Sequence, residues 1–79
     1  MGSIVSLAKM KSGDTGMVVE LQLGGRRADQ LAAMGVRPGV MVTKQSGQPL
    51  RGPITFRVGR SELAVGHGIA RRILVEMPQ

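Results

Sequence analysis

The stretch of sequence that decides the fold spans residues 27–39 and reads RADQLAAMGVRPG. Its alanine, leucine, glutamine and methionine residues are good helix formers, so we predict a helix over residues 26–34. Ala28, Leu31 and Met34 recur every three residues and form the stripe that we expect to be buried. Gly35 would cap the helix in a left-handed conformation, and Pro38 prevents the helix from continuing.

The other face of this predicted helix is polar, and we expect its side chains to be exposed: Arg26, Arg27 and Gln30. Two glycines, Gly24 and Gly25, precede the helix. A glycine turn before a helix can hold a phosphate, because the first N–H groups of a helix favour anions. Neither a glycine-rich fingerprint nor a Gly-Lys-Ser/Thr sequence follows, so we interpret the pair as a simple strand-to-helix turn.

Short segments with strand character flank the helix. Residues 17–23 alternate with a period of two, and we predict that one set faces the core: Met17, Val19, Leu21 and Leu23. Further strands are predicted over residues 40–45, 54–58, 61–65 and 73–77. The segments 54–58 and 61–65 would form a hairpin, and residues 69–71 a single helical turn. About five strands, with one short helix after the first, predict a mainly β fold that closes into a small barrel.

The composition fits one small domain. We expect this domain to span residues 1–79, with residues 1–6 as a lead-in before Leu7 and Met10, which lie on one face of a short turn. Phe56 is the only aromatic residue, so aliphatic side chains and methionines must build the core. The absence of cysteine excludes disulfides and thiolate metal sites and fits a cytoplasmic location. No apolar run approaches the ~20 residues that span a bilayer.

The net charge of +6 is compatible with an acidic partner: nucleic acid, an anionic membrane surface or an acidic protein face. Solubility alone explains the charge equally well. Nucleic-acid binding by stacking is disfavoured, because the chain has no tyrosine or tryptophan and Phe56 is needed in the core. Salt-sensitive binding through phosphates stays open.

Groups for catalysis or metal binding are scarce. The chain has one histidine, His67, and five carboxylates. A divalent metal site uses three or four ligands, and only Glu62 and Glu76 are plausible companions for His67. We therefore predict no enzyme activity, no catalytic residue, no cofactor and no tight metal site, and we interpret His67 as an exposed loop histidine.

Several motifs, taken in order along the chain, resemble one family. Residues 27–39 resemble the R-x-x-x-L-x-x-M/L-G-[IV]-x-P-G segment of the FeoA family, the ferrous iron transport protein A. The family's other motifs are matched by Leu7, Met10 and Gly13, and by residues 49–54, 62–65 and 70–75. The matched positions are mainly a fold signature: Leu31, Met34, Gly35, Pro38, Gly39, Gly52 and Pro53. Leu31 and Met34 would be the helix side chains that plug the barrel.

The resemblance implies an SH3-like barrel and a small cytoplasmic protein that assists the ferrous-iron permease FeoB. The implied mode of action is binding to the permease's cytoplasmic GTP-binding domain, which would place the protein at the inner membrane through its partner. No DNA-binding domain precedes the matched segment, so we expect a stand-alone protein. Exposure and charge select the candidate partner-binding residues: Arg26, Arg27, Gln30 and Arg51.

The sequence departs from the family pattern at two places. Lys44 occupies a position that is often apolar in the family, and residues 66–69 replace a stretch that is usually more charged, which predicts a more mobile loop. Two other functions stay open: a basic SH3-like module for nucleic-acid binding or transcriptional regulation, and an iron-binding chaperone or sensor. Weak self-association through an edge strand or a methionine patch is a further expectation.

Overall fold

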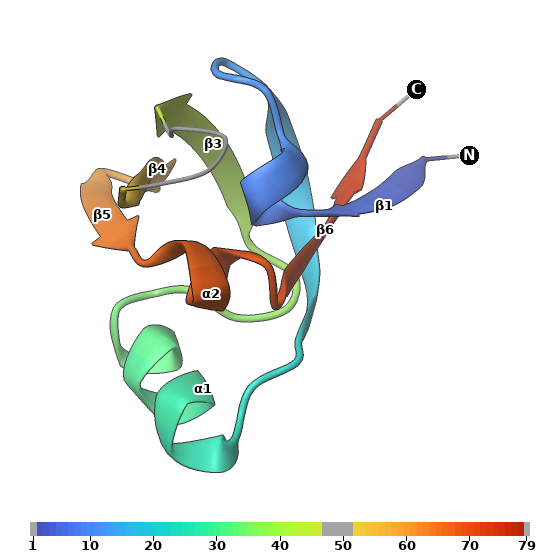
Figure 1. The fold of residues 1–79 in the computed structure, drawn as a ribbon. Helices are drawn as coiled ribbons and strands as arrows, with labels where there is room; N and C mark the ends of the chain where they lie inside the picture. Colours follow the sequence, from blue (N-terminus) through green and yellow to red (C-terminus); the bar gives the residue numbers. More distant parts are fainter. Residues whose placement is uncertain (1, 47–51, 79) are drawn as a thin grey trace.

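A computed structural model describes residues 2–46 and 52–78 of the chain (Figure 1). The elements are, in order, β1 (Ser3–Ser6), the 3-10 helix η1 (Leu7–Lys9), β2 (Thr15–Leu21), α1 (Gly25–Ala33), β3 (Met41–Ser46), β4 (Ile54–Val58), β5 (Ser61–Val65), α2 (His67–Ala70) and β6 (Ile73–Met77). The fold is therefore mainly β, as predicted, and the hairpin of β4 and β5 has the predicted bounds.

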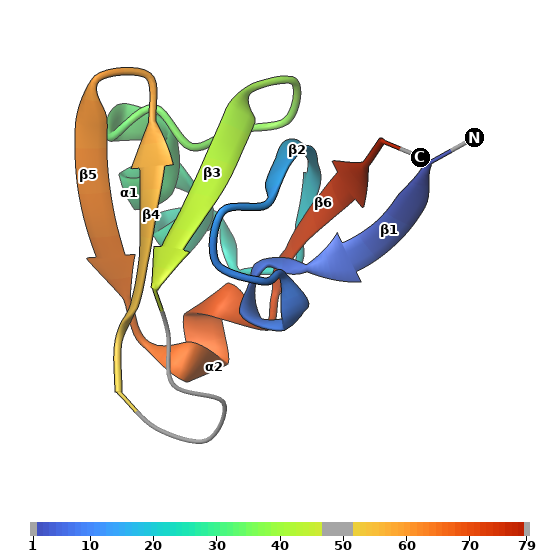
Figure 2. The same ribbon diagram turned by 90° about the horizontal axis from the view of Figure 1, so that it is seen from above.

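The strands form one antiparallel sheet of six strands in the order β1-β6-β2-β3-β4-β5. The sheet curves around the core, with β1, β6 and β2 on one side and β3, β4 and β5 on the other (Figure 2). The prediction of a closed barrel of five strands was wrong, because β1 and β5 remain as two edges of the described sheet. The extra strand comes from the segment expected to be a lead-in, where Ser3 pairs with Met77. As a result α1 follows the second strand and not the first.

A β-bulge in β2 changes which side chains face the core. The register of β2 against β6 shifts between Val18 and Glu20. Before the shift Gly16 and Val18 are buried, whereas after it Leu21 packs against the core. The extra residue of a bulge reverses the inside–outside alternation. The predicted core face was therefore wrong for Met17 and Val19, and right for Leu21 and Leu23.

Helix α1 ends in a Schellman motif. The amide of Val36 donates to the carbonyl of Leu31 at 2.8 Å, and the amide of Gly35 donates to Ala32 at 2.9 Å. Gly35 has φ +96°, the left-handed conformation that was predicted for the cap. Leu31 and Val36 are both buried in the core cluster, as this motif favours. Met34 is 46% exposed, so the prediction that it plugs the core was wrong: the chain reverses at Gly35, and Val36 is buried in the core instead.

The unexpected Lys44 lies inside the protein. It is 5% exposed, and its Nζ donates hydrogen bonds to the carbonyl oxygens of Ala8 at 3.0 Å and Met10 at 2.6 Å. The backbone of Lys44 also pairs with the turn before β2, through Gly13 at 2.8 Å and Asp14 at 2.9 Å. Lys44 therefore connects β3 to η1 and to the turn that follows it. Burial lowers the pKa of Lys44, and the negative charge of Asp14 opposes this shift.

The segment predicted as a mobile loop before the last strand contains a short helix instead. α2 begins at His67, after the N-cap Gly66, and amide–carbonyl bonds run from Ala70 to Gly66 and from Arg71 to His67 at 3.0 Å each. Ala70 is fully buried and packs this turn against the core. The largest fully buried side chain of this core is Phe56. The helical turn predicted over residues 69–71 thus starts two residues earlier.

Candidate partner-binding surface

Helix α1 projects from the sheet as a separate feature (Figure 1). The extended N-cap Gly24 precedes its first residue, and Leu31 packs its inner side against the core. Arg26, Arg27 and Gln30 are exposed on it, as expected from the sequence. Arg51, the fourth candidate residue, lies outside the described residues. The structure thus places three of the four candidates on one short helix.

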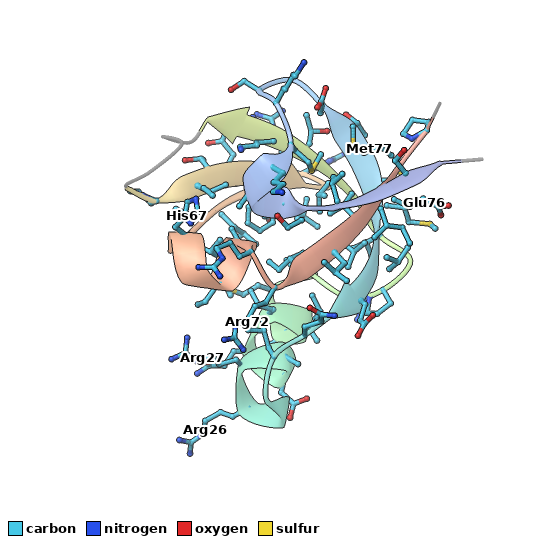
Figure 3. The ribbon with its side chains drawn as sticks, turned by 45° about the vertical axis from the view of Figure 1, so that its right-hand side comes forward. Arg26, Arg27, His67, Arg72, Glu76 and Met77 are labelled. Atoms are coloured by element: carbon cyan, nitrogen blue, oxygen red, sulfur yellow. The ribbon has the colours of Figure 1, made fainter. Side chains whose placement is uncertain are left out.

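A groove separates α1 from the segment that contains α2. Its wider part has a volume of about 550 Å³ and is lined by Leu23, Gly24, Arg27, Gly66, Gly68, Ile69 and Arg72. Figure 3 shows Arg27 and Arg72 lying close together at this junction, with Arg26 farther out on α1. Three of the lining residues are glycines, which have no side chain. The main polar groups of this hollow are therefore backbone groups and the two arginine side chains.

A second hollow continues from the first along α1. It has a volume of about 260 Å³ and is lined by Arg27, Gln30, Leu31, Met34, Ala64, Val65, Gly66 and Ile69. Arg27, Gly66 and Ile69 line both hollows, so the two form one depression, which we call the α1–α2 groove. Two arginines line its wide end, whereas its narrow end is lined mainly by apolar side chains, with Arg27 shared by both ends.

The electrostatics of the α1–α2 groove are one-sided. The structure describes all five acidic residues of the chain, and none of them lines the groove. Within the described ranges the one ion pair is Arg57–Glu62, at 3.2 Å on the surface. Arg27 and Arg72 are therefore not neutralised by a salt bridge there, and they can attract a carboxylate or phosphate.

Sequence reasoning found Arg27 and Gln30 but missed the rest of the groove. Met34 was assigned to the core, and Ile69 and Arg72 were assigned no role. Met34 is the C-cap residue of α1, immediately before the cap glycine Gly35, so the helical stripe ends before it. The meeting of residues 23–34 with residues 64–72 is a long-range contact that no local pattern reveals.

His67 is half-buried in α2, and not exposed in a loop as predicted. Among the residues with a described structure, no three His, Cys, Asp or Glu side chains gather in a way that could hold a metal ion. None of the described helices is long and apolar enough to cross a membrane.

A methionine patch lies on another part of the surface. A hollow of about 280 Å³ is lined by Gly2, Met17, Met41, Glu76, Met77 and Pro78. Met17 pairs with Met41 on β3 and with Glu76 on β6, so these three side chains form a row across three strands. Figure 3 shows Glu76 and Met77 close to the two chain ends, far from Arg26 and Arg27. None of the described residues that line this hollow is basic.

Comparison with known proteins identifies relatives of the chain. The FeoA domain model matches residues 5–77. A crystal structure described as iron uptake regulatory protein (FeoA) shares 39% identity with a TM-score of 0.85, and the match covers 96% of this chain and 100% of that one. No protein with a curated description matches the chain significantly.

Two more distant structures show the same fold. FeoA of Stenotrophomonas maltophilia, described as an SH3 domain protein and solved with zinc, has 23% identity and a TM-score of 0.74, and the match covers 90% of this chain and 88% of that one. A manganese-dependent transcriptional repressor has 18% identity and a TM-score of 0.83; the match covers 99% of this chain but 44% of the repressor. The predicted SH3-like character of the fold is thus supported by its neighbours. The match over residues 5–77 and the 39% identity together show that the chain belongs to the FeoA family, small accessory domains of ferrous iron transport.

Proposed function

We propose that the protein is a cytoplasmic accessory of ferrous iron uptake that binds the GTP-binding region of a FeoB-type permease and has no catalytic activity of its own. The observation that carries this proposal is the exposed basic helix α1 beside a groove without carboxylates, on a domain of the FeoA family. The binding residues that we assign to this surface are Arg26, Arg27 and Gln30, and Arg51 remains a fourth candidate.

The charge of this surface supports a protein partner with an acidic face. Arginines attract carboxylates from a distance and then form two parallel hydrogen bonds with them, which gives both fast encounter and a fixed orientation. The assigned residues lie on one short helix and are charged or polar, so we expect a transient complex that salt weakens.

Co-purification with the isolated GTP-binding domain of the permease from the same organism tests this proposal. The double variant Arg26→Glu/Arg27→Glu reverses two charges on α1 and should lose about tenfold or more in affinity. Lys9→Glu/Lys11→Glu is the matched control, because it makes the same change in net charge at two exposed residues that line neither hollow of the α1–α2 groove. We expect the control to bind almost as well as the parent.

Equal losses in the two variants would show that only net charge matters and would contradict the assignment of α1. A parent protein that fails to retain the GTP-binding domain at low salt would overturn the proposed function. Binding of random DNA by the parent at the same salt concentration would favour the nucleic-acid alternative instead.

A further inference from the structure

We infer that the α1–α2 groove binds a peptide segment of the partner in one direction, with a carboxylate at the Arg27–Arg72 end and an apolar side chain at the Met34 end. This inference rests on the proposed function, because it names the chemistry of the permease segment that would occupy the groove.

The first argument is the division of the groove into two chemically different ends. Arg27 and Arg72 line the wide end, and the glycines beside them add no side chains to it. Met34, Leu31 and Val65 line the narrow end together with Gln30, and Arg27 lies where the two ends join. A ligand must therefore be amphipathic, and its polar and apolar groups must follow one another along α1.

The second argument is the exposure of Met34. Its side chain is 46% exposed, one of three large apolar side chains of the described residues that remain this accessible. The other two are Ile4 and Met41, which belong to other parts of the surface. A methionine beside a buried leucine offers an adaptable apolar contact, since its thioether chain is flexible and polarizable.

The third argument is charge complementarity, which selects the occupant. No acidic side chain of the chain lines the groove, and all five are described. A second copy of this basic chain would bring mainly positive charge to two arginines that lack ion-pair partners in the described structure. An acidic amphipathic segment of a different protein satisfies both ends, whereas nucleic acid would leave the apolar end empty.

The experiment combines two point variants with amide chemical-shift mapping of the 79-residue chain. The chain is titrated with the permease's GTP-binding domain and with overlapping synthetic peptides from its cytoplasmic region. Arg72→Gln removes one charge at the wide end, and Met34→Glu places a repelling charge at the narrow end. Met34 is exposed, so this variant should fold. Met41→Glu is the matched control, because Met41 is 52% exposed and lies on the methionine patch.

We expect shifts at residues 23–34 and 64–72, and a loss of affinity of about tenfold for Arg72→Gln and Met34→Glu but not for Met41→Glu. Peptides that bind should contain an apolar residue next to acidic ones, and replacing those acids with amides should abolish binding. If the GTP-binding domain binds while the groove amides stay unshifted, the groove assignment is overturned and the proposed function survives. If neither the domain nor any peptide binds, both are overturned.

Discussion

Replacing Lys44 with methionine tests whether a buried ammonium group holds η1 against β3. The Nζ atom of Lys44 donates to the carbonyl oxygens of Ala8 and Met10 at 3.0 and 2.6 Å. Methionine keeps the length and the apolar part of the side chain but cannot donate, so two carbonyls lose their donor. Each loss costs about 1–3 kcal/mol, and removing a desolvated charge offsets part of the total. We expect the free energy of unfolding of Lys44→Met to fall by about 2 kcal/mol.

Urea unfolding at fixed pH measures this change, and thermal unfolding should show a midpoint lower by about 8–16 °C for a domain of this size. Lys9→Met is the control, since Lys9 is exposed. Amide exchange should accelerate at residues 7–14, which Lys44 holds, more than at the distant α1. A variant as stable as the parent would refute the idea that the two hydrogen bonds outweigh the burial of the charge.

The alkaline pH dependence of stability gives a second readout on the same residue. Burial lowers the pKa of Lys44 in the folded chain below its ordinary value of 10.5, so between the two values the unfolded chain binds more protons. The free energy of unfolding therefore rises with pH in this window. The chain contains no tyrosine or cysteine and only two other lysines, so few groups mask the effect. We expect Lys44→Met to lose the rise, and a decrease for the parent across this window would contradict the argument.

Three glycine substitutions test the fold, beside the binding predictions given above. Gly35→Ala should lower the free energy of unfolding by about 1–2 kcal/mol, because φ is +96° there and alanine is strained in this conformation. Gly25→Ala, in the first turn of α1 with open space around its Cβ, should instead raise it by about 0.5–1 kcal/mol, and urea midpoints that moved in the same direction would contradict the reasoning. Gly16→Ala should cost about 1–3 kcal/mol, because the new Cβ would overlap the Val75 side chain and lie 2.8 Å from the Glu76 carbonyl oxygen; an unchanged melting midpoint would show that β2 and β6 can separate freely.

Local sequence patterns predicted the elements whose cause is local. The helix cap at Gly35 was predicted correctly, because a Schellman motif depends on residues within one turn. The hairpin over residues 54–65 was likewise recognisable from its alternation and its short turn. The core face of β2 was only half right, since the bulge after Val18 is set by pairing with β6, more than fifty positions along the chain.

Local sequence patterns could not predict the edge strand β1, the contacts of Lys44 or most of the groove. The strand over residues 3–6 shows little alternation of its own and exists because the last strand offers an edge. Lys44 looked like a departure from the family pattern, but the carbonyls that it binds come from residues 8 and 10, far away in sequence. In the candidate site, Arg27 was predictable from exposure and charge. Arg72 lines the same groove because the chain after α2 returns to α1, and no local pattern predicts this return.

Ferrous iron uptake in living cells tests the central claim most directly. Cells that keep the permease gene but lack the gene for this protein would receive the parent, Arg26→Glu/Arg27→Glu or Lys9→Glu/Lys11→Glu, and the initial rate of radioactive Fe²⁺ entry would be measured at matched permease levels. Our account predicts that deletion changes the rate, and that the parent and the lysine variant restore it while the α1 variant does not. A rate that is the same with and without the protein would contradict the claim that this FeoA domain serves the permease.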